Sequence, residues 1–381
     1  MKIGIDISQI IYEGTGVGSY TKNLVENLLK LEGQDEIVLF GSSLRQYYKL
    51  NNFYQKVRNL GNIDYSFFHI PEKVLNILWN DIHIIGVDNL LGSVDVFHSS
   101  DWIQPPSKAK KITTIHDLVV YKYPDLSDPY IVSTQKKRLK LVKKECDLII
   151  AVSESTKKDI VEILGIPEEK IRVVYPGIDD KFHTRNDKEI MKMKKKYNIL
   201  GDYILSVGTI EPRKNLDRLI EAFKLFSNHS LIKTLDEPIE LVLVGKTGWG
   251  SLLPLPQHVR KLGLVEDELL PVLYSGAAMF LYPSLYEGVG YPILEAMASG
   301  TPVITSDRGS PKEVAGEAGL YVDPLDIKEI SIKMTNLFID NKRREKMIEM
   351  GLAQARQFNW LKTARQTLSL YRELYSDEDN K

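Results

Sequence analysis

The sequence predicts an α/β protein with two doubly wound, Rossmann-like domains. In both halves of the chain, short apolar runs typical of buried parallel strands alternate with amphipathic stretches typical of helices. At 381 residues the chain exceeds the size at which one hydrophobic core stays compact, so two domains are expected. A proline and a glycine interrupt the pattern at Tyr175-Pro176-Gly177-Ile178-Asp179 and mark the crossing between the halves.

The first half opens with a buried strand, an amphipathic helix and a second strand, as a doubly wound domain does. Ser153 is expected to cap the helix that follows a later strand. Residues 42–91 carry aromatic side chains without a clean period, so irregular helices and loops are expected there, which either shape a binding surface or fill the core. The predicted strands are 2–7, 36–40, 94–99, 111–115, 147–152 and 171–174, and the predicted helices are 20–31 and 154–164.

The second half repeats the alternation and ends in a helix that starts near Trp360 and continues to about Tyr375. Before it, a loop turns into a short helix in which Pro292 suits the first helical position and Gly300 the C-terminal cap. The other predicted helices are 188–197 and 266–274, and the predicted strands are 203–207, 241–244, 278–282 and 302–305.

Composition is that of an ordinary globular protein, with 43% hydrophobic and 27% charged residues. A formal net charge of -1 gives no indication of nucleic-acid binding. Two basic runs are either solvated helix faces or surfaces that meet an anionic membrane. The first run is Lys136, Lys137, Arg138, Lys140, Lys143 and Lys144, and the second is Lys188, Lys192, Lys194, Lys195 and Lys196.

Several features favour a cytoplasmic protein. Cys146 is the single cysteine, so no disulfide forms within the chain and nothing argues for secretion. The N-terminus enters a strand at once, which leaves no room for a signal peptide. No apolar run approaches the ~20 residues that span a bilayer, so any membrane contact is expected to be peripheral, at the inner face.

The segment from Glu287 to Glu295 is a candidate phosphate site. Gly288 and Gly290 let a ligand approach the backbone, and the N–H groups of Val289, Gly290 and Tyr291 lie at the positive end of the helix dipole. Glu295 is expected in the first turn, accepting hydroxyl protons beside the phosphate, with Glu287 on the other side of the ligand. A plain loop-to-helix junction is the alternative.

A second phosphate-binding segment follows the strand 203–207. Gly208 and Thr209 provide backbone flexibility, Arg213 can bridge two phosphate oxygens, and Lys214 adds a compact charge. An exposed basic pair on a loop is the alternative.

Two further candidates lie in the first half. Gly16 and Gly18 stand in a glycine-rich loop, which is either a ligand loop or a flexible surface loop. His116 and Asp117 follow the strand 111–115, at the carboxyl end where open α/β sheets bind ligands. A lone His is also common as a satisfied structural residue.

Two glutamates separated by seven residues, with glycines and a proline between them, resemble the donor-site motif of retaining glycosyltransferases of family four, which have the GT-B fold. The similarity continues through Leu281-Tyr282-Pro283-Ser284, Gly300-Thr301-Pro302-Val303-Ile304 and Gly319-Leu320-Tyr321-Val322-Asp323-Pro324. Many relatives have Phe-Gly-Leu-Pro where this chain has Val289-Gly290-Tyr291-Pro292. The side chains around the nucleotide are therefore expected to differ while the backbone seat is kept.

The resemblance implies a domain organisation. Residues 1–180 would form an acceptor-binding domain and residues 181–360 a domain that binds the nucleotide sugar, the two facing each other across a cleft. Residues 361–381 would form a helix that crosses back to the first domain, followed by a polar tail.

The resemblance also implies roles. Gly16 and Gly18 would approach the donor diphosphate and the acceptor. His116 would contact the transferred sugar, with Asp117 orienting the imidazole or binding an acceptor hydroxyl. The segment from Gly208 to Lys214 resembles the family's diphosphate-binding stretch, and Thr209 stands where many relatives have Arg.

We therefore expect a retaining hexosyltransferase that uses a nucleoside diphosphate sugar and needs no metal and no cofactor. Arg213, Lys214 and the start of the helix at Val289–Tyr291 would neutralise the leaving diphosphate. Glu287 would hold the sugar and Glu295 the ribose. Arg213, Lys214, Glu287 and His116 are the expected catalytic residues.

The glycine-rich and Glu211-Pro212-Arg213-Lys214-Asn215 segments look most like those of bacterial mannosyltransferases of surface-polysaccharide assembly. GDP-mannose is the first expectation for the donor, with UDP-glucose or UDP-N-acetylglucosamine as alternatives, and a glycan or lipid-linked glycan as the acceptor. A nicotinamide dehydrogenase and a two-lobed solute-binding protein are the rival classes. The first lacks its glycine fingerprint and the second its export signal.

Overall fold

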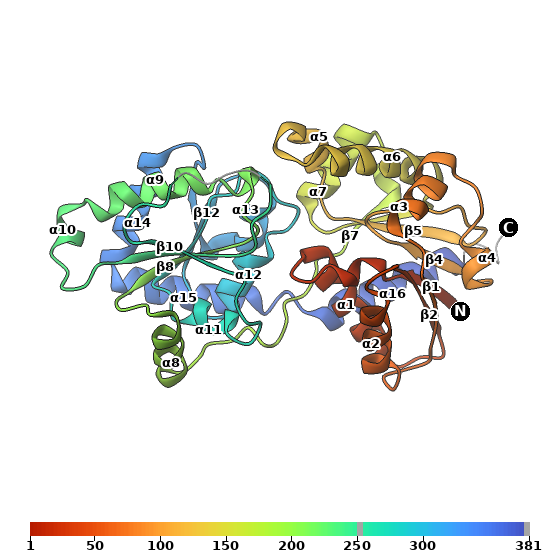
Figure 1. Ribbon diagram of the computed structural model, residues 1–381, viewed down its shortest axis with the longest axis horizontal. Helices are drawn as coiled ribbons and strands as arrows, with labels where there is room; N and C mark the ends of the chain where they lie inside the picture. The colour runs from red at the N-terminus through yellow and green to blue at the C-terminus, as the bar shows by residue number, and fades with distance from the viewer. Residues whose placement is uncertain (250–253, 377–381) are drawn as a thin grey trace. The chain divides into compact units, whose positions relative to one another are not determined.

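The computed structural model describes residues 1–249 and 254–376, which form two compact units (Figure 1). Unit 1 consists of Met1–Gly177 and the C-terminal segment from Asn359, and unit 2 of Ile178–Phe358. The chain thus passes from unit 1 to unit 2 and returns. The expected polar tail, residues 377–381, lies outside the described residues.

Unit 1 contains a seven-stranded parallel sheet with the order β3-β2-β1-β4-β5-β6-β7. Ile3 of the first strand pairs with Ile37 on one side and with Val96 on the other. The order therefore reverses between β1 and β4, the kind of place where open α/β sheets bind ligands. The strands are β1 (Lys2–Asp6), β2 (Glu36–Ser42), β3 (Ile63–Phe68), β4 (Val96–Ser99), β5 (Lys110–Ile115), β6 (Leu148–Ala151) and β7 (Ile171–Val173).

Helices cover both faces of this sheet (Figure 1). They are α1 (Gly16–Leu29), α2 (Tyr47–Val57), α3 (Glu72–Leu75) with a π-helical turn (Asn76–Ile82), α4 (Asp88–Leu91), α5 (Val119–Lys122), α6 (Pro129–Glu145), α7 (Glu154–Asp159) with a second π-helical turn (Ile160–Leu164), and α16 (Trp360–Ser376). Ser153 caps α7 by accepting from Thr156 N, as predicted. Short 3-10 turns occupy Ser8–Ile11, Pro124–Leu126 and Glu168–Lys170.

The last helix, α16, packs against α1, as expected from the sequence. The Trp360 and Tyr20 rings meet edge to face with their centroids 5.6 Å apart. A Cβ atom on Gly177 would lie 2.2 Å from Trp360 N, so only glycine lets the end of the first segment pass the start of α16.

Unit 2 contains a six-stranded sheet with the order β10-β9-β8-β11-β12-β13, whose strands are all parallel. Its order reverses between β8 and β11. The strands are β8 (Tyr203–Val207), β9 (Glu240–Val244), β10 (Val259–Gly263), β11 (Met279–Tyr282), β12 (Val303–Ser306) and β13 (Gly319–Val322).

The helices of unit 2 also lie on both faces (Figure 1). Leu219, Phe223 and Phe226 of α9 share one buried cluster with Ile330 and Met334 of α14. A capping box starts α8, because Asn186 and Glu189 each accept from the other's backbone N–H. The helices are α8 (Asp187–Tyr197), α9 (Leu216–Ser227), α10 (Ser230–Lys233), α11 (Leu270–Ser275), α12 (Tyr291–Ala298), α13 (Gly309–Ala315), α14 (Ile327–Ile339) and α15 (Asn341–Ala355), with 3-10 turns at Pro212–Lys214 and Gly316–Ala318.

Most predicted elements are confirmed, but several boundaries were wrong. The first helix starts at Gly16 rather than at Tyr20, and the helix expected from Glu266 begins only at Leu270. The sequence pattern also missed three edge strands, β3, β10 and β13, in which burial is partial and the apolar period is weak. Within residues 1–249 and 254–376, no helix is long and apolar enough to cross a bilayer.

Candidate functional site

Two loops are locked together where the strand order of unit 2 reverses. One follows β8 and contains the 3-10 turn Pro212–Lys214, and the other joins β11 to α12. Leu285 N donates to Arg213 O at 2.9 Å, and Ser284 Oγ lies 3.1 Å from the same carbonyl oxygen. The loop after β8 is therefore held in one position by the loop after β11.

Asn215 holds these loops together through two hydrogen bonds from its side chain. Its backbone is left-handed, with φ of 60°, a region that Asn tolerates better than most residues. Its amide Nδ2 donates to Pro283 O at 3.0 Å and to Pro324 O at 2.6 Å. One side chain thus ties the start of α9 to the loops after β11 and β13.

The loop after β9 approaches the same place. Gly208 N donates to Val244 O at 2.9 Å, and Ile210 N donates to Lys246 O at 2.9 Å. A Cβ atom on Gly245 would lie 2.0 Å from Gly208 O, and Gly245 has a φ of 143°. Glycine is required at this crossing, which brings three loops to one end of the sheet.

Glu287 joins the two predicted cations. Arg213 Nη1 lies 2.6 Å from Glu287 Oε2, and Lys214 Nζ lies 2.7 Å from Glu287 Oε1. Ser284 Oγ donates to Oε1 as well, at 2.6 Å. The other guanidinium nitrogen of Arg213 forms a short contact with Glu211. Two partly buried cations and two buried carboxylates are thus gathered in one cluster, and their formal charges cancel.

The surroundings shift the pKa values in this cluster. Burial alone would raise the pKa of the Glu287 carboxyl. The charges of Arg213 and Lys214 and the hydrogen bonds from Lys214 and Ser284 outweigh burial and lower the pKa to about 2. Burial and the neighbouring Arg213 charge lower the pKa of Lys214, while Glu287 and Glu211 act in the opposite direction.

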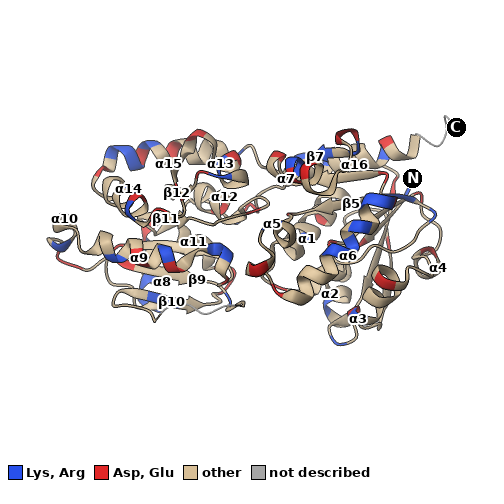
Figure 2. Ribbon diagram, turned by 90° about the horizontal axis from the view of Figure 1, so that it is seen from above, with Lys and Arg blue, Asp and Glu red and all other residues tan. Residues whose placement is uncertain are grey.

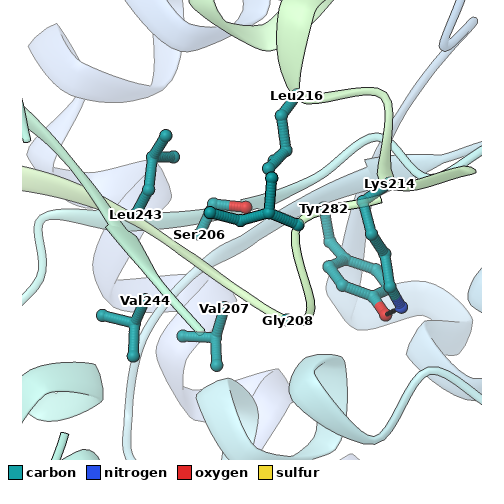
Figure 3. Close-up of a pocket in the computed structure, with 9 residues that line it drawn as sticks. Ser206, Val207, Gly208, Lys214, Leu216, Leu243, Val244 and Tyr282 are labelled. Atoms are coloured by element: carbon teal, nitrogen blue, oxygen red, sulfur yellow. Dashed lines mark hydrogen bonds between the residues drawn. The ribbon is translucent and has the colours of Figure 1, made fainter. Parts of the chain in front are cut away.

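A small pocket lies beside this cluster (Figure 3). The Lys214 amine and the Tyr282 hydroxyl point to each other there, with Nζ 2.5 Å from the hydroxyl oxygen and 4.9 Å from the ring centroid. The lining residues are Ser206, Val207, Gly208, Ile210, Lys214, Leu216, Leu243, Val244 and Tyr282. A rigid cation next to a glycine backbone suits a phosphate group.

The start of α12 lies on the same loop. Gly290 is the N-cap residue, with φ of 86°, and Tyr291 is the first helical residue. Gly288, Val289 and Gly290 are buried. Ser310 Oγ donates to Glu287 O at 2.7 Å, so α13 also holds the loop. The Glu287 carbonyl is therefore anchored to α13, three residues before the N-cap of α12.

The expected place of Glu295 was wrong. It is the fifth residue of α12, and no acidic residue occupies the first turn. Tyr274 Oη donates to Glu295 Oε2 at 2.7 Å. Burial raises the pKa of the Glu295 carboxyl to about 7, although the hydrogen bond from Tyr274 acts to lower it. This carboxyl therefore changes its charge near neutral pH.

Gly16 and Gly18 do not form a loop, which corrects the prediction for unit 1. Gly16 is the first residue of α1, and the N-cap Thr15 accepts from Gly18 N at 3.2 Å. A Cβ atom on Gly18 would lie 3.1 Å from the carbonyl oxygens of Gln9 and Tyr12. Gly18 therefore allows a tight helix start after the turn at Ser8–Ile11.

His116 directly follows β5 and packs against α1. Its ring meets the Tyr20 ring edge to face, with centroids 4.8 Å apart and an angle of 87°. Burial lowers the pKa of the imidazole to about 4, the Asp117 charge opposes this, and the Arg138 charge adds to it. Asp117 Oδ1 accepts from Val119 N at 3.0 Å. The imidazole is thus neutral at physiological pH.

Three residues with a place in these sites were not singled out from the sequence. Glu211 and Tyr282 contact Arg213 and Lys214, but no local pattern reveals those contacts. Asp6 ends β1, where the order of the first sheet reverses, and burial raises its pKa. The signal in the sequence that could have identified Asp6 is an acidic residue at the end of the first strand. Within the described residues, no group of three or more His, Cys, Asp or Glu side chains is placed to hold a metal.

The candidate residues fall into two groups. Gly208, Thr209, Arg213, Lys214, Glu287 and residues 288–291 come together at one end of the sheet of unit 2, with Glu295 behind them on α12. Gly16, Gly18, His116 and Asp117 belong to unit 1.

Sequence comparison matches both units to glycosyltransferase families. Residues 187–354 match the family described as "Glycosyl transferases group 1", and residues 14–182 match "Glycosyltransferase Family 4". The chain is 30% identical over 394 residues to the O-antigen chain mannosyltransferase B of Escherichia coli. That alignment covers 98% of this chain and 100% of the relative.

Solved structures share the architecture. Sucrose-phosphate synthase from Thermosynechococcus elongatus aligns with a TM-score of 0.74 and 20% identity, over 99% of this chain and 100% of that one. The HepE protein of Anabaena in complex with UDP-glucose aligns with a TM-score of 0.71 and 16% identity, over 98% and 100% of the two chains. Similarity at this level of identity concerns the fold.

Proposed function

We propose that this chain, which belongs to glycosyltransferase family 4, transfers mannose from GDP-mannose to a hydroxyl of a glycan or lipid-linked glycan, with retention of the anomeric configuration. The expected enzyme class, glycosyl transfer by a hexosyltransferase, and the expected GT-B fold are confirmed. The family assignment replaces the two rival classes, the dehydrogenase and the solute-binding protein.

The choice of donor is supported by the chain's full-length similarity to an O-antigen chain mannosyltransferase. The proposed acceptor is then a surface polysaccharide, to which the sugar is added. UDP-glucose is the second candidate, because a structural neighbour was solved with that ligand. UDP-N-acetylglucosamine is the third.

The observation that carries the proposal is the Glu287 carboxylate, which holds Arg213 and Lys214 side by side at the place where the strand order reverses. Cleavage of a sugar diphosphate places negative charge on the leaving group. Two oriented cations, together with the amides of residues 289–291, can stabilise that charge without reorganising. The proposed reaction does not require a metal for this task.

The other residues take matching roles in the proposal. Glu287 keeps the cations in place and offers its remaining acceptor capacity to a sugar hydroxyl, and Glu295 accepts from the ribose hydroxyls. His116 contacts the transferred sugar as a neutral imidazole, with Asp117 beside it. Because no carboxylate is assigned as a nucleophile, departure and attack are proposed to occur on the same face of the sugar.

The two units divide the work in this proposal. Unit 2 binds the nucleotide sugar and unit 1 binds the acceptor, while Gly16 and Gly18 approach the donor diphosphate as well and His116 contacts the transferred sugar. A lipid-linked acceptor would place the enzyme at the inner face of a membrane as a peripheral protein.

A donor screen tests the proposal. Hydrolysis of GDP-mannose, UDP-glucose and UDP-N-acetylglucosamine is followed without acceptor, and GDP-mannose is expected to be consumed fastest. The product formed with a glycan acceptor is then analysed by NMR, and the anomeric configuration of the donor is expected to be retained. An inverted product, or activity abolished by a chelator, would refute the proposed mechanism, and faster hydrolysis of a UDP-sugar would refute the proposed donor.

A further inference from the structure

A group of apolar side chains is exposed on unit 1 between β3 and α4. Val74, Ile77, Ile82, Ile84 and Ile85 have exposed fractions of 49%, 52%, 56%, 50% and 52%. All five lie within one short stretch of chain, and we call them the apolar ledge. Single exposed apolar residues are common, but a contiguous set marks an interaction surface.

The apolar ledge is built on fixed backbone. Trp79 is fully buried, and its Nε1 donates to Ile85 O at 2.9 Å. The His83 ring nitrogen Nδ1 lies 2.7 Å from Trp79 O. His83 and Ile85 both have a φ of 59°, which is rare for a β-branched residue such as Ile. The Trp79 indole thus holds the backbone of Ile85, and the contact between the His83 ring and Trp79 O fixes the backbone just before Ile84.

The apolar ledge runs beside the first basic run, on α6. Three contacts along the helix link the two segments. Asn76 Nδ2 lies 3.5 Å from Thr134 Oγ1, Lys137 pairs with Asp81, and His83 Nε2 lies 2.6 Å from Glu145 Oε1. Because these contacts follow α6 from its first half to its last residue, the two segments lie side by side.

The exposed side of α6 is cationic. Lys137, Lys140, Lys143 and Lys144 are exposed, whereas Arg138 and Leu139 between them are buried. Of these four lysines, Lys137 forms the ion pair with Asp81. Figure 2 shows the blue positions along α6. Unit 1 therefore presents a row of lysines next to a row of isoleucines.

We propose that the apolar ledge and the lysines of α6 together form a docking surface for an anionic lipid bilayer. Isoleucines can enter the acyl boundary while lysines meet the negatively charged headgroups. A second copy of this chain fits less well, because two such faces would bring two rows of lysines together. This inference deepens the proposed function, because it names the surface that makes the peripheral membrane contact, and it does not depend on the donor sugar.

Vesicle sedimentation tests the docking surface. The full chain is mixed with vesicles of phosphatidylcholine alone and with vesicles that also contain phosphatidylglycerol, and binding only to the second kind is expected. Lys140→Glu/Lys143→Glu/Lys144→Glu should lower the partition coefficient about 100-fold, since each lysine near an anionic surface contributes roughly a factor of five. Ile77→Ser/Ile82→Ser/Ile84→Ser/Ile85→Ser should lower it at least about tenfold.

Matched controls come from unit 2. Lys188→Glu/Lys192→Glu/Lys195→Glu makes the same charge change in α8. Leu225→Ser/Leu231→Ser/Ile332→Ser/Ile339→Ser replaces side chains of similar exposure. Both controls should bind as the parent does. Thermal melting of every variant establishes that it is folded.

Each outcome decides the matter. Equal losses in the test and control variants, equal binding to both vesicle types, or concentration-dependent dimers that the isoleucine variant abolishes would each overturn the proposal. Hydrolysis of the donor without acceptor is measured in parallel. If the parent binds vesicles but hydrolyses no sugar nucleotide, the proposed function fails while the docking surface stands.

Discussion

Tyr371 and His98 are 273 positions apart in the sequence, and the hydroxyl of Tyr371 lies 2.6 Å from His98 Nδ1. The other nitrogen, Nε2, lies 3.0 Å from Thr114 Oγ1, which in turn is 3.3 Å from the Tyr20 hydroxyl. The Tyr20 ring packs on His116. A chain of contacts thus runs from α16 through the sheet of unit 1 to the imidazole that we assign to the reaction.

Tyr371→Phe should destabilise the protein by about 1–2 kcal/mol, because the buried His98 loses a hydrogen-bond partner. Urea denaturation measures the change. Tyr375→Phe on the same helix is the control, since that side chain is 38% exposed, and it should leave the midpoint unchanged. Equal midpoints for parent and Tyr371→Phe would show that the contact contributes nothing to stability.

Glu287→Gln should destabilise the protein by roughly 3–5 kcal/mol, because Arg213 and Lys214 lose a shared buried carboxylate. The pKa of Glu287 is lowered to about 2, so its contribution is present above about pH 4.5 and is lost as the pH falls towards 2. Chemical denaturation at several pH values should show this loss in the parent but not in the variant.

The same variant separates binding from turnover. Turnover should fall at least about 100-fold because the cations are no longer oriented, whereas GDP, measured by calorimetry, should bind no more weakly than to the parent. Glu211→Gln is the matched control, since Glu211 contacts Arg213 but leaves the pairing of Lys214 with Glu287 intact. A turnover loss as large in the control would assign the effect to Arg213 alone.

Glu295→Gln should raise stability at alkaline pH. The pKa of Glu295 is raised to about 7, so the stabilising effect of its protonated form is complete below about pH 4.5 and disappears as the pH rises through 7. The difference amounts to about 3 kcal/mol at most. Melting curves at about pH 4 and about pH 8.5 should coincide for parent and variant only at the lower value.

The affinity for the donor should fall in Glu295→Gln, because an amide oxygen accepts from the ribose hydroxyls less well than a carboxylate does. Glu349→Gln, an exposed position on α15, is the control and should change neither quantity. If the variant melts at the same temperature as the parent at both pH values, the ionised Glu295 carboxylate does not destabilise the fold.

His116→Ala should reduce turnover about 100-fold or more and leave GDP binding within about twofold. Because burial lowers the pKa of the imidazole to about 4, turnover should show no inflection from His116 between about pH 6 and 7. The inflection expected there belongs to Glu295 and should be absent in Glu295→Gln. Initial rates across this range check both statements, and an inflection that persists in Glu295→Gln would contradict them.

Local signals explain what the sequence could predict. The strand Tyr203–Val207 was predicted to the residue because an apolar run is bounded by polar and glycine positions. Gly16 and Gly18 were placed in a loop because glycine is a poor helix former, but the Thr15 cap and the packing of α1 outweigh that propensity. The partly exposed edge strand β3 gave no periodic signal.

The chemistry of the site needed the structure. Arg213 and Lys214 were recognised as cations and Glu287 as an acid, yet the expectation gave them separate parts of the ligand. They are 74 and 73 positions apart from Glu287, and the bonds between them arise only when two strands lie next to each other. Tyr274 and Glu295 also come together only in the fold, where the Tyr274 hydroxyl donates to the Glu295 carboxylate.

The return of the chain to unit 1 has a consequence for biosynthesis. Residues up to Gly177 leave the ribosome long before Trp360 is made, while Ile178–Phe358 emerges as an uninterrupted stretch. Unit 2 can therefore complete its fold first, whereas the nascent amino-terminal sheet must wait, with Tyr20 and His98 uncovered, until translation has almost ended. An mRNA truncated before the codons of α16 would yield a polypeptide in which unit 2 is folded and unit 1 exposes apolar surface. Such a polypeptide would be a substrate for chaperones and proteases.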